Sequence, residues 1–340
     1  MSHYSKLIPI IFFFLLTSCG ADRFEVDVDD IELDIPIRRL DLELFELEPD
    51  EILAYHQQKV GAGDVFYEEF IEAILRAGPM DIDSITVPRL KRFLLDPNWN
   101  SAQASAEETF GDMSIQKANL EDAFKRYITF FPGESVPNIV VFNSGFNYAI
   151  YPMENTIGIG IEWFIGQEAD IVKRLAPDRF PNFMKQRMRP EFIVNSTMTG
   201  WLFVHHYADL TGKDLLTNMI HHGKVLYAVD KILVDKPDSI KIGYTQAQLD
   251  WCKEHEFNIW TDLAGNDVLF SKTPREVNRI MGDGPFTNGF PRESPGRIGE
   301  WVGWQIVTAY MDDHKELTIE ELFGEIDPQE IMKSYRPSKN

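Results

Sequence analysis

The sequence contains little cysteine, and this excludes a framework of disulfides. Its 340 residues include two cysteines, Cys19 and Cys252. We expect Cys19 to carry a lipid, for reasons given below, so Cys252 has no partner for an intramolecular disulfide. Because Cys252 follows Trp251 in a helical pattern, we interpret it as a small buried apolar side chain rather than a reactive thiol.

Motifs that mark several large enzyme classes are also missing. The chain has no His-Glu-x-x-His zinc motif, no G-x-x-x-x-G-K-[ST] phosphate-binding loop and no G-x-S-x-G nucleophile elbow. Ser196 and Ser294 therefore lack the sequence setting of a hydrolase nucleophile. The sequence favours a protein that is not an enzyme.

Positive charge is scarce. The chain has 33 lysines and arginines against 54 aspartates and glutamates, which gives a formal net charge of −21. Such a surface repels nucleic acid and anionic headgroups, so we expect no nucleic-acid partner. A protein partner would meet it with a basic patch. Hydrophobic residues make up 44% of the chain and aromatic residues 12%, which allows a sizeable core and excludes wholesale disorder.

The chain begins with an apolar run that is too short to cross a bilayer. Residues 7–16 are almost wholly apolar, broken only by Pro9, and follow the positive charge of Lys6. A spanning helix needs ~20 apolar residues. The run leads into Leu16-Thr17-Ser18-Cys19, the pattern of a bacterial lipobox, in which small residues precede the cysteine that accepts the lipid.

We therefore predict a lipoprotein. Residues 1–18 form its signal peptide, and the Cys19 thiol takes up a diacylglycerol. Two or three acyl chains such as palmitate, at ~0.8 kcal/mol per buried methylene, anchor a protein stably where one chain does not. The mature chain is exported and tethered to the inner or outer membrane, and it faces the periplasm or the cell surface.

Beyond the signal, the pattern predicts one globular domain behind a short tether. We interpret residues 19–30 as an acidic tether. Residues 31–340 show no composition break, so we predict a single α+β domain, mostly helical with a small β-sheet. Within it we expect an N-terminal strand and helix layer at 31–135, central strands at 136–161 and a helical C-terminal half at 162–340.

Hydrophobic periodicity places the elements. Residues 31–47 alternate between apolar and charged side chains, which predicts a strand with one buried face, and Pro36 predicts that it lies at a sheet edge. Apolar, β-branched runs predict further strands at 136–142, 148–151 and 156–161. Three- and four-residue spacing predicts helices at 64–77, 86–95, 118–131, 190–209, 213–234, 245–263, 274–281, 296–313 and 318–324.

Two glycines alternate with isoleucines in the last predicted strand. This strand has one apolar face, formed by Ile157 and Ile159, and one face without side chains, formed by Gly158 and Gly160. Another backbone or a ligand could therefore lie close to the bare face.

Histidines supply the candidate metal ligands. His205-His206 and His221-His222 lie in two predicted helices, and Asp209 follows His205 by four residues, on the same face. One histidine from each helix with Asp209 would give three ligands that zinc accepts. Adjacent histidines on a helix point ~100° apart and cannot easily hold one metal, so we interpret these residues as polar positions in or near the core.

The alternative, a zinc site in a hydrolase, defines a set of candidate residues. The candidate ligands are His205, His206, Asp209 and His222, and the candidate bases are Glu162 and Glu191. In the preferred interpretation the chain has no metal or other cofactor.

The segment 282–305 is the densest unusual stretch. The loop 282–295 is rich in Gly and Pro and is longer than a simple connector needs to be. Gly296, Gly299 and Gly303 then recur at helix spacing, which predicts a core helix packed closely on a neighbour. The alternative is a groove for a ligand or partner, lined by Phe286, Arg297, Trp301 and Trp304.

Several short segments, spread over nearly the whole chain, carry a family resemblance. They are the lipobox at Cys19, Arg38-Arg39-Leu40-Asp41, Gly223-Lys224-Val225-Leu226-Tyr227, Gly243-Tyr244-Thr245, Trp251-Cys252-Lys253, Asp283-Gly284-Pro285-Phe286-Thr287, Ser294-Pro295-Gly296-Arg297-Ile298-Gly299 and Gly303-Trp304-Gln305-Ile306-Val307. The last three segments are the most specific. Together they resemble the gliding-motility lipoprotein GldB family.

The resemblance implies a function. Proteins of this family are envelope lipoproteins of Bacteroidetes that gliding motility needs, and they accompany the type IX secretion machinery. More remotely, the chain is similar to predicted peptidases of the zincin type, which carry His-Glu-x-x-His on one helix and a Glu just ahead of a Gly on the next. Here His222 precedes Gly223 and the two-histidine motif is absent, which implies a degenerate zincin-like scaffold kept for binding.

Two functions follow from these observations. The first is a non-catalytic, lipid-anchored envelope component that binds protein components of the gliding or secretion apparatus. The alternative is a divergent metal-dependent hydrolase of the envelope, similar to a zincin peptidase. A purely structural spacer ranks below both, because a spacer rarely needs so aromatic a core.

Overall fold

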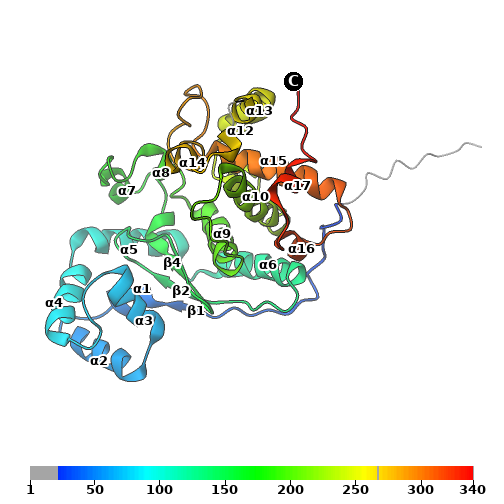
Figure 1. The fold of residues 1–340 in the computed structure, drawn as a ribbon. Helices are drawn as coiled ribbons and strands as arrows, with labels where there is room; N and C mark the ends of the chain where they lie inside the picture. The colour runs from blue at the N-terminus through cyan, green and yellow to red at the C-terminus, as the bar shows by residue number, and fades with distance from the viewer. Residues whose placement is uncertain (1–21, 266–267, 340) are drawn as a thin grey trace, which may run out of the picture.

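The computed structural model describes residues 22–265 and 268–339 (Figure 1). The predicted signal peptide and the lipid-accepting Cys19 lie outside the described residues, and the lipoprotein assignment of that cysteine stays a prediction. None of the helices in the described part of the chain is long and apolar enough to cross a membrane.

A small mixed sheet lies at the centre of the fold. Its strands are β1 (Ile37–Arg39), β2 (Asn138–Phe142), β3 (Ile150–Pro152) and β4 (Thr156–Gly160), in the order β1-β2-β4-β3. The first three in that order run parallel, and β3 pairs antiparallel with β4. The three predicted central strands are confirmed, as is the α+β class with a mostly helical chain.

The strand predicted at 31–47 is wrong beyond three residues. The chain pairs with β2 over Ile37–Arg39 and then turns into a helix at Leu40. Leu40 and Leu44 are four residues apart, so they share a helix face as well as strand parity. Both are buried in one apolar cluster, which favours the helix. The predicted edge position is confirmed, since β1 ends the sheet.

Helices from the first half of the chain follow β1. They are α1 (Leu40–Phe45), α2 (Ile52–Ala62), α3 (Val65–Glu69), a π-helix (Phe70–Ile74), α4 (Asp83–Leu94), α5 (Pro97–Phe110) and α6 (Ser114–Phe130). The helices predicted near 64–77, 86–95 and 118–131 are confirmed. The sequence analysis predicted neither α2 nor α5. Helix α5 has no conspicuous apolar stripe, because it buries small residues such as Ala102 and Ala106.

The second half of the chain is helical, as predicted. Its elements are a 3₁₀ turn (Ile161–Phe164), α7 (Asp170–Arg174), α8 (Asn182–Lys185), a second 3₁₀ turn (Pro190–Phe192), α9 (Ile193–His205), α10 (Leu215–Ile232), α11 (Asp238–Ile242), α12 (Gln246–Glu254), α13 (Glu256–Gly265), a third 3₁₀ turn (Val268–Phe270), α14 (Pro274–Met281), α15 (Ile298–Asp313), α16 (Ile319–Leu322) and α17 (Pro328–Met332). Helix α14 begins and ends where the spacing predicts.

Each face of the sheet packs against an apolar core of its own. On β2, Ile139 and Val141 belong to the larger core, whereas Val140 and Phe142 belong to the smaller one. This follows from the two-residue period of a strand. Helices α1–α4 cover the smaller core, and α6, α9, α10 and α15 build the larger one (Figure 1).

The bare face of β4 is filled by the protein itself. A Cβ added to Gly158 would lie 2.6 Å from the ring of Phe66 and 2.7 Å from that of Phe142. One added to Gly160 would lie 2.0 Å from the carbonyl oxygen of Tyr148. The predicted close approach is confirmed, and it is made by two aromatic rings and a loop backbone.

Local caps fix where two important helices begin. Asp214 is the N-cap of α10, which begins at the next residue, Leu215. The Asp214 Oδ1 atom accepts a hydrogen bond of 2.9 Å from the backbone N–H of Thr217. Asp96 Oδ1 accepts one of 2.8 Å from the N–H of Asn98, and Pro97 occupies the first position of α5. Both carboxylates are therefore committed to helix starts.

Helices α10 and α15 cross at unusually close range. A Cβ on Gly303 would lie 1.9 Å from the carbonyl oxygen of Met219, and one on Gly223 would lie 2.3 Å from the carbonyl oxygen of Gly303. Trp301 and Trp304, on the same helix, are buried at 1% and 6% exposure. The predicted tightly packed core helix is confirmed, and glycine is required on both sides of the contact.

The first described residues lie against the body of the domain. Phe24 packs edge-on against Phe130 and Tyr227, with ring centres 6.0 Å apart in both pairs. Asp22 accepts a hydrogen bond of 2.6 Å from Lys231 Nζ. This part of the predicted tether is therefore held on the surface of α6 and α10.

The helix crossing generates a stability prediction. Gly303→Ala should lower the free energy of unfolding by at least about 2 kcal/mol, because the new methyl meets a backbone carbonyl that cannot move without separating the helices. Chemical denaturation measures this directly.

Gly61→Ala is the matched control. Gly61 lies within α2 and a Cβ there would meet no atom within 4 Å, so this change should stabilise the fold by ~1 kcal/mol. Equal effects of the two substitutions would contradict the close contact.

Candidate functional site

A well-formed cavity lies beside α9. It has a volume of about 420 Å³, within the usual range for small-molecule and cofactor sites. The first 3₁₀ turn, the segment after α8, and helices α9, α10, α11 and α15 form its walls. Its lining comprises Ala149, Trp163, Phe164, Met184, Arg187, Met188, Phe192, Asn195, Ser196, Thr199, Gly200, Phe203, His222, Val225, Leu226, Lys241, Ile242, Gly243, Arg297 and Glu300.

One face of α9 forms a wall of this cavity. Ser196, Thr199, Gly200 and Phe203 follow the three- and four-residue spacing of a single helix face. Asn195 joins them at its edge. The small side chains leave room over the helix, and the aromatic and aliphatic side chains of the other walls make the cavity largely apolar.

Three uncharged polar groups in this apolar lining have no hydrogen-bond partner in the described structure. They are Asn195 Oδ1, Thr199 Oγ1 and Trp163 Nε1. A buried polar group without a partner costs about 1–3 kcal/mol, so proteins rarely keep several together. All three belong to residues that line one cavity, which makes it the candidate binding site.

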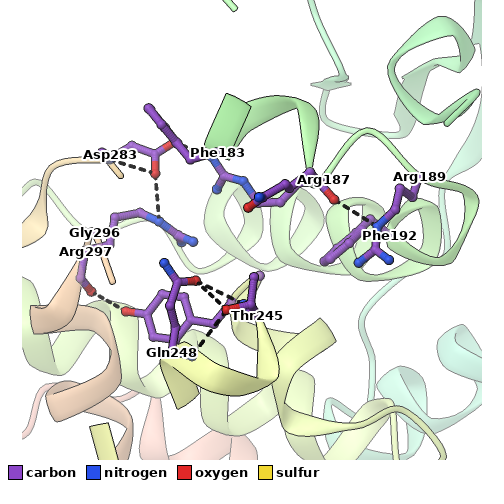
Figure 2. A pocket seen from close by; sticks show the side chains of 13 residues that line it. Phe183, Arg187, Arg189, Phe192, Thr245, Gln248, Asp283, Gly296 and Arg297 are labelled. Atoms are coloured by element: carbon purple, nitrogen blue, oxygen red, sulfur yellow. Dashed lines mark hydrogen bonds and ion pairs between the residues drawn. The ribbon is translucent and has the colours of Figure 1, made fainter. Parts of the chain in front are cut away.

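A row of alternating charges runs along one side of the cavity. His222 Nδ1 lies 3.3 Å from Glu300 Oε1, and Glu300 Oε2 lies 2.6 Å from Arg297 Nη1. Arg297 Nε lies 3.3 Å from Asp283 Oδ1, and the other Asp283 oxygen pairs with Arg187 Nη2. Figure 2 shows the Asp283 carboxylate facing the Arg297 side chain. These contacts connect α10, α15, the loop after α14 and the segment after α8.

Arg297 is the centre of this row. It caps α15 with φ +56°, and its Nη2 donates a hydrogen bond of 3.0 Å to the carbonyl of Ile242. The Tyr244 hydroxyl donates one of 3.0 Å to the Arg297 carbonyl, and the guanidinium lies 5.6 Å from the centre of the Tyr244 ring. One side chain thus fixes the start of α15 against the end of α11.

Mutual pairing keeps Glu300 and Arg297 charged. Burial alone would raise the pKa of Glu300, but the Arg297 guanidinium and His222 hold it below its ordinary value. Burial alone would lower the pKa of Arg297, and Glu300, Tyr244 and Asp283 raise it instead. Burial and the charge of Arg297 lower the pKa of Arg187, although the carboxylate of Asp283 acts to raise it. Glu300 and Arg297 are therefore an ion pair at neutral pH.

A smaller pocket of about 50 Å³ continues from the cavity. The two share Arg187, Phe192, Gly243 and Arg297. Figure 2 shows Thr245 and Gln248 on its other side, at the start of α12. This pocket therefore lengthens the cavity on the side of its arginines.

The candidate zinc ligands His205 and His206, at the end of α9, pack against aromatic side chains. The ring centres of His205 and Trp201 are 3.7 Å apart. The ring centre of His206 lies 4.4 Å from that of Phe131 and 4.5 Å from that of Phe323. Burial lowers the pKa of His206 to about 4, and His205 adds to this. His206 is thus neutral at physiological pH.

The other candidate ligands lie elsewhere. Asp209 accepts a hydrogen bond of 2.9 Å from the N–H of Thr211 in the loop after α9, whereas His222 lines the cavity and faces Glu300. Across residues 22–265 and 268–339, no group of three or more His, Cys, Asp or Glu side chains is placed to hold a metal ion.

The predicted groove residues separate in the structure. Arg297 lines both pockets, whereas Trp301 and Trp304 are core residues of α15. Phe286 is half-buried in the loop before that helix. Cys252 is fully buried, as predicted, and burial raises the pKa of its thiol.

The two candidate bases have different roles. Glu191 is exposed and pairs with Arg189 at 2.7 Å. Glu162 is fully buried, and its Oε1 accepts hydrogen bonds from the Ser144 N–H, the Ser144 hydroxyl and the Phe146 N–H at 2.8–2.9 Å. Its Oε2 has no partner in the described structure. Glu162 therefore fixes the loop after β2.

The cavity also contains residues that sequence reasoning missed. Arg187, Asn195, Thr199 and Lys241 occur in stretches without a distinctive motif, and Glu300 lies in the unusual segment 282–305 but was not named as a candidate. Polar residues on one face of the otherwise apolar α9 were the available signal, and the same pattern is typical of an ordinary amphipathic helix.

Glu162 generates a pH prediction. Burial raises its pKa from 4.5 to about 7, against the opposing hydrogen bonds from Phe146 and Ser144. The folded state then holds the proton more tightly than the unfolded chain. Below pH 4.5, the ordinary pKa of the carboxyl, this proton contributes its full stabilisation to the fold. As the pH rises through about 7 the contribution is lost, and the free energy of unfolding falls by about 3 kcal/mol.

Glu162→Gln keeps an acceptor for the loop and removes this titration. Urea denaturation at about pH 5 and about pH 8 should show that the variant gains stability relative to the wild type at the higher pH, by about 3 kcal/mol. The same pH dependence in both proteins would rule out this role of Glu162.

Comparison with known proteins identifies the family. The family described as gliding motility protein GldB matches residues 21–337, which is nearly the whole chain. No curated protein matches the chain, and no solved structure does; the similarity to zincin scaffolds stays a prediction. The match agrees with the resemblance carried by the segments around Arg38, Gly223 and Arg297. The chain belongs to the gliding motility protein GldB family of lipoproteins.

Proposed function

We propose that the protein serves gliding as a non-catalytic binding component of the cell envelope. In this proposal the cavity beside α9 receives a peptide segment of a partner protein in the gliding or type IX secretion apparatus. The observation that carries it is the apolar cavity of about 420 Å³ with three unpartnered polar groups, Asn195 Oδ1, Thr199 Oγ1 and Trp163 Nε1.

The chemistry of these groups favours a peptide. The Asn195 Oδ1 atom accepts hydrogen bonds and the Trp163 Nε1–H group donates them, so together they complement the N–H and C=O of a main chain. The apolar walls suit an aliphatic or aromatic side chain. Arg187 and Arg297 at the junction with the smaller pocket suit a carboxylate.

The lipid anchor belongs to the same proposal. Acylation of Cys19 would tether the chain three residues before Asp22, the first described residue, which is paired with Lys231. Three residues span at most about 11 Å. The body of the domain would therefore sit directly at the membrane, with the face around Asp22 and Phe24 toward the lipid.

The cavity proposal is tested by filling it. Ser196→Phe places an aromatic ring in the cavity, and we expect cells of the native host carrying it to lose surface movement at normal protein level. Val204→Phe adds the same ring at an exposed position of the same helix, and gliding should persist. Normal gliding with a stable Ser196→Phe protein would sink the proposal.

A gentler change separates binding from folding. Thr199→Val keeps the shape of the side chain and removes an unpartnered hydroxyl, so the folded protein should gain about 1 kcal/mol while gliding weakens. Loss of gliding through instability would instead appear as a lowered melting temperature.

The anchor is tested at its attachment site. Cys19→Ala should release the protein from the membrane fraction and stop gliding, because the described chain has no membrane-spanning helix to replace the lipid. Fractionation and spreading on a surface measure the two effects. A Cys19→Ala strain that glides normally would show that the lipid is dispensable.

A further inference from the structure

A second cavity, of about 350 Å³, shares no lining residue with the first. Four arginines line it: Arg76 after the π-helix, Arg89 and Arg92 on α4, and Arg179 in the loop before α8. Asp96 is the acidic residue in this lining, and its carboxylate caps α5. In a chain with a net charge of −21, four positive charges face one negative charge here.

The four guanidinium groups have no ion-pair partner in residues 22–265 and 268–339, whereas Arg38, Arg187 and Arg297 all do. Arg89 donates one hydrogen bond of 3.2 Å to the Ala77 carbonyl, and Arg179 donates one of 3.3 Å to Asn147 Oδ1. Each guanidinium carries five N–H donors, so most of the donors remain available to a ligand.

The floor of this cavity is a rigid loop. Ser144, Gly145 and Asn147 line it directly after β2. Glu162 holds the loop through the three hydrogen bonds described above, and Asn143 Oδ1 accepts another of 3.1 Å from the Gly145 N–H. The cavity thus lies outside the carboxyl end of a parallel strand, where ligands commonly bind in α/β sheets.

An aromatic wall completes it. Phe93 and Trp99 stack with ring centres 6.3 Å apart and an interplanar angle of 29°, and both line the cavity together with Phe180. The Arg179 guanidinium lies 5.3 Å from the centre of the Phe180 ring. Flat apolar surface therefore stands beside the positive charge.

We propose that this arginine cavity, lined by Arg76, Arg89, Arg92 and Arg179, binds a phosphate ester. A phosphate monoester brings up to two negative charges and three acceptor oxygens, which match planar guanidinium groups better than ammonium groups. The aromatic wall accepts the apolar or cyclic body of the ester. This site is separate from the proposed peptide cavity and does not depend on it.

The position of the cavity selects between two sources of phosphate. Figure 1 shows the first described residues near α16, on the opposite side of the molecule from α4. A lipid on Cys19 would hold that opposite side at the membrane. The arginine cavity, beside α4, would therefore lie far from the anchoring bilayer, which favours a soluble phosphate ester over a headgroup of that bilayer.

Calorimetric titration of the full chain in detergent tests the proposal, with phenyl phosphate and inorganic pyrophosphate as probes at low salt. We expect millimolar or tighter binding that weakens with salt. The double variant Arg89→Gln, Arg92→Gln should lose at least about tenfold in affinity. Both residues are exposed, so the melting temperature should not change.

The matched control is the double variant Arg275→Gln, Arg292→Gln, which removes two exposed arginines outside the cavity and should bind like the wild type. Equal weakening in both variants, or no binding of either probe, would overturn the proposal. Stronger binding of hexaglutamate or of phosphatidylglycerol vesicles through Arg89 and Arg92 would overturn the choice of a phosphate ester.

Discussion

The close crossing of α10 and α15 is the constraint on which the rest of the structure depends. Because Gly223 and Gly303 let the two backbones touch, His222 on one helix reaches Glu300 on the other. Arg297, at the start of α15, then connects Glu300 to Asp283 and to the carbonyl of Ile242 at the end of α11. A larger residue at either glycine would push the two helices apart. Because both helices contribute residues to the lining of the cavity, its wall would change as well. Packing and site geometry therefore have one common cause.

Periodicity and glycine spacing predicted much of the fold but little of the site. The bounds of α14 and the close packing of α15 follow from local patterns that the sequence displays directly. The error at 31–47 arose because Leu40 and Leu44 fit a strand and a helix equally well, and tertiary burial decides between them. Arg297 was a candidate groove residue, but the cavity itself could not be predicted in this way, because its walls bring together residues from 187 to 300 that meet only in the folded chain.

Both cavities lie where parallel strands end. The chain leaves β2 into the loop that floors the arginine cavity, and it leaves β4 into the turn that carries Trp163 to the other cavity. Glu162, within that turn, holds the first loop by three hydrogen bonds. One buried carboxylate thus connects the turn beside one cavity to the loop beside the other.

In the proposed function, the buried Arg297–Glu300 ion pair beside the cavity contributes to binding of the peptide. Replacing a buried ion pair by apolar residues of similar size is often neutral or stabilising. The direct test is the double variant Arg297→Met, Glu300→Leu, with its melting temperature and the gliding of its host measured together. The account predicts a folded protein with near-normal stability in cells that no longer glide. Normal gliding by cells that contain the folded variant would contradict it.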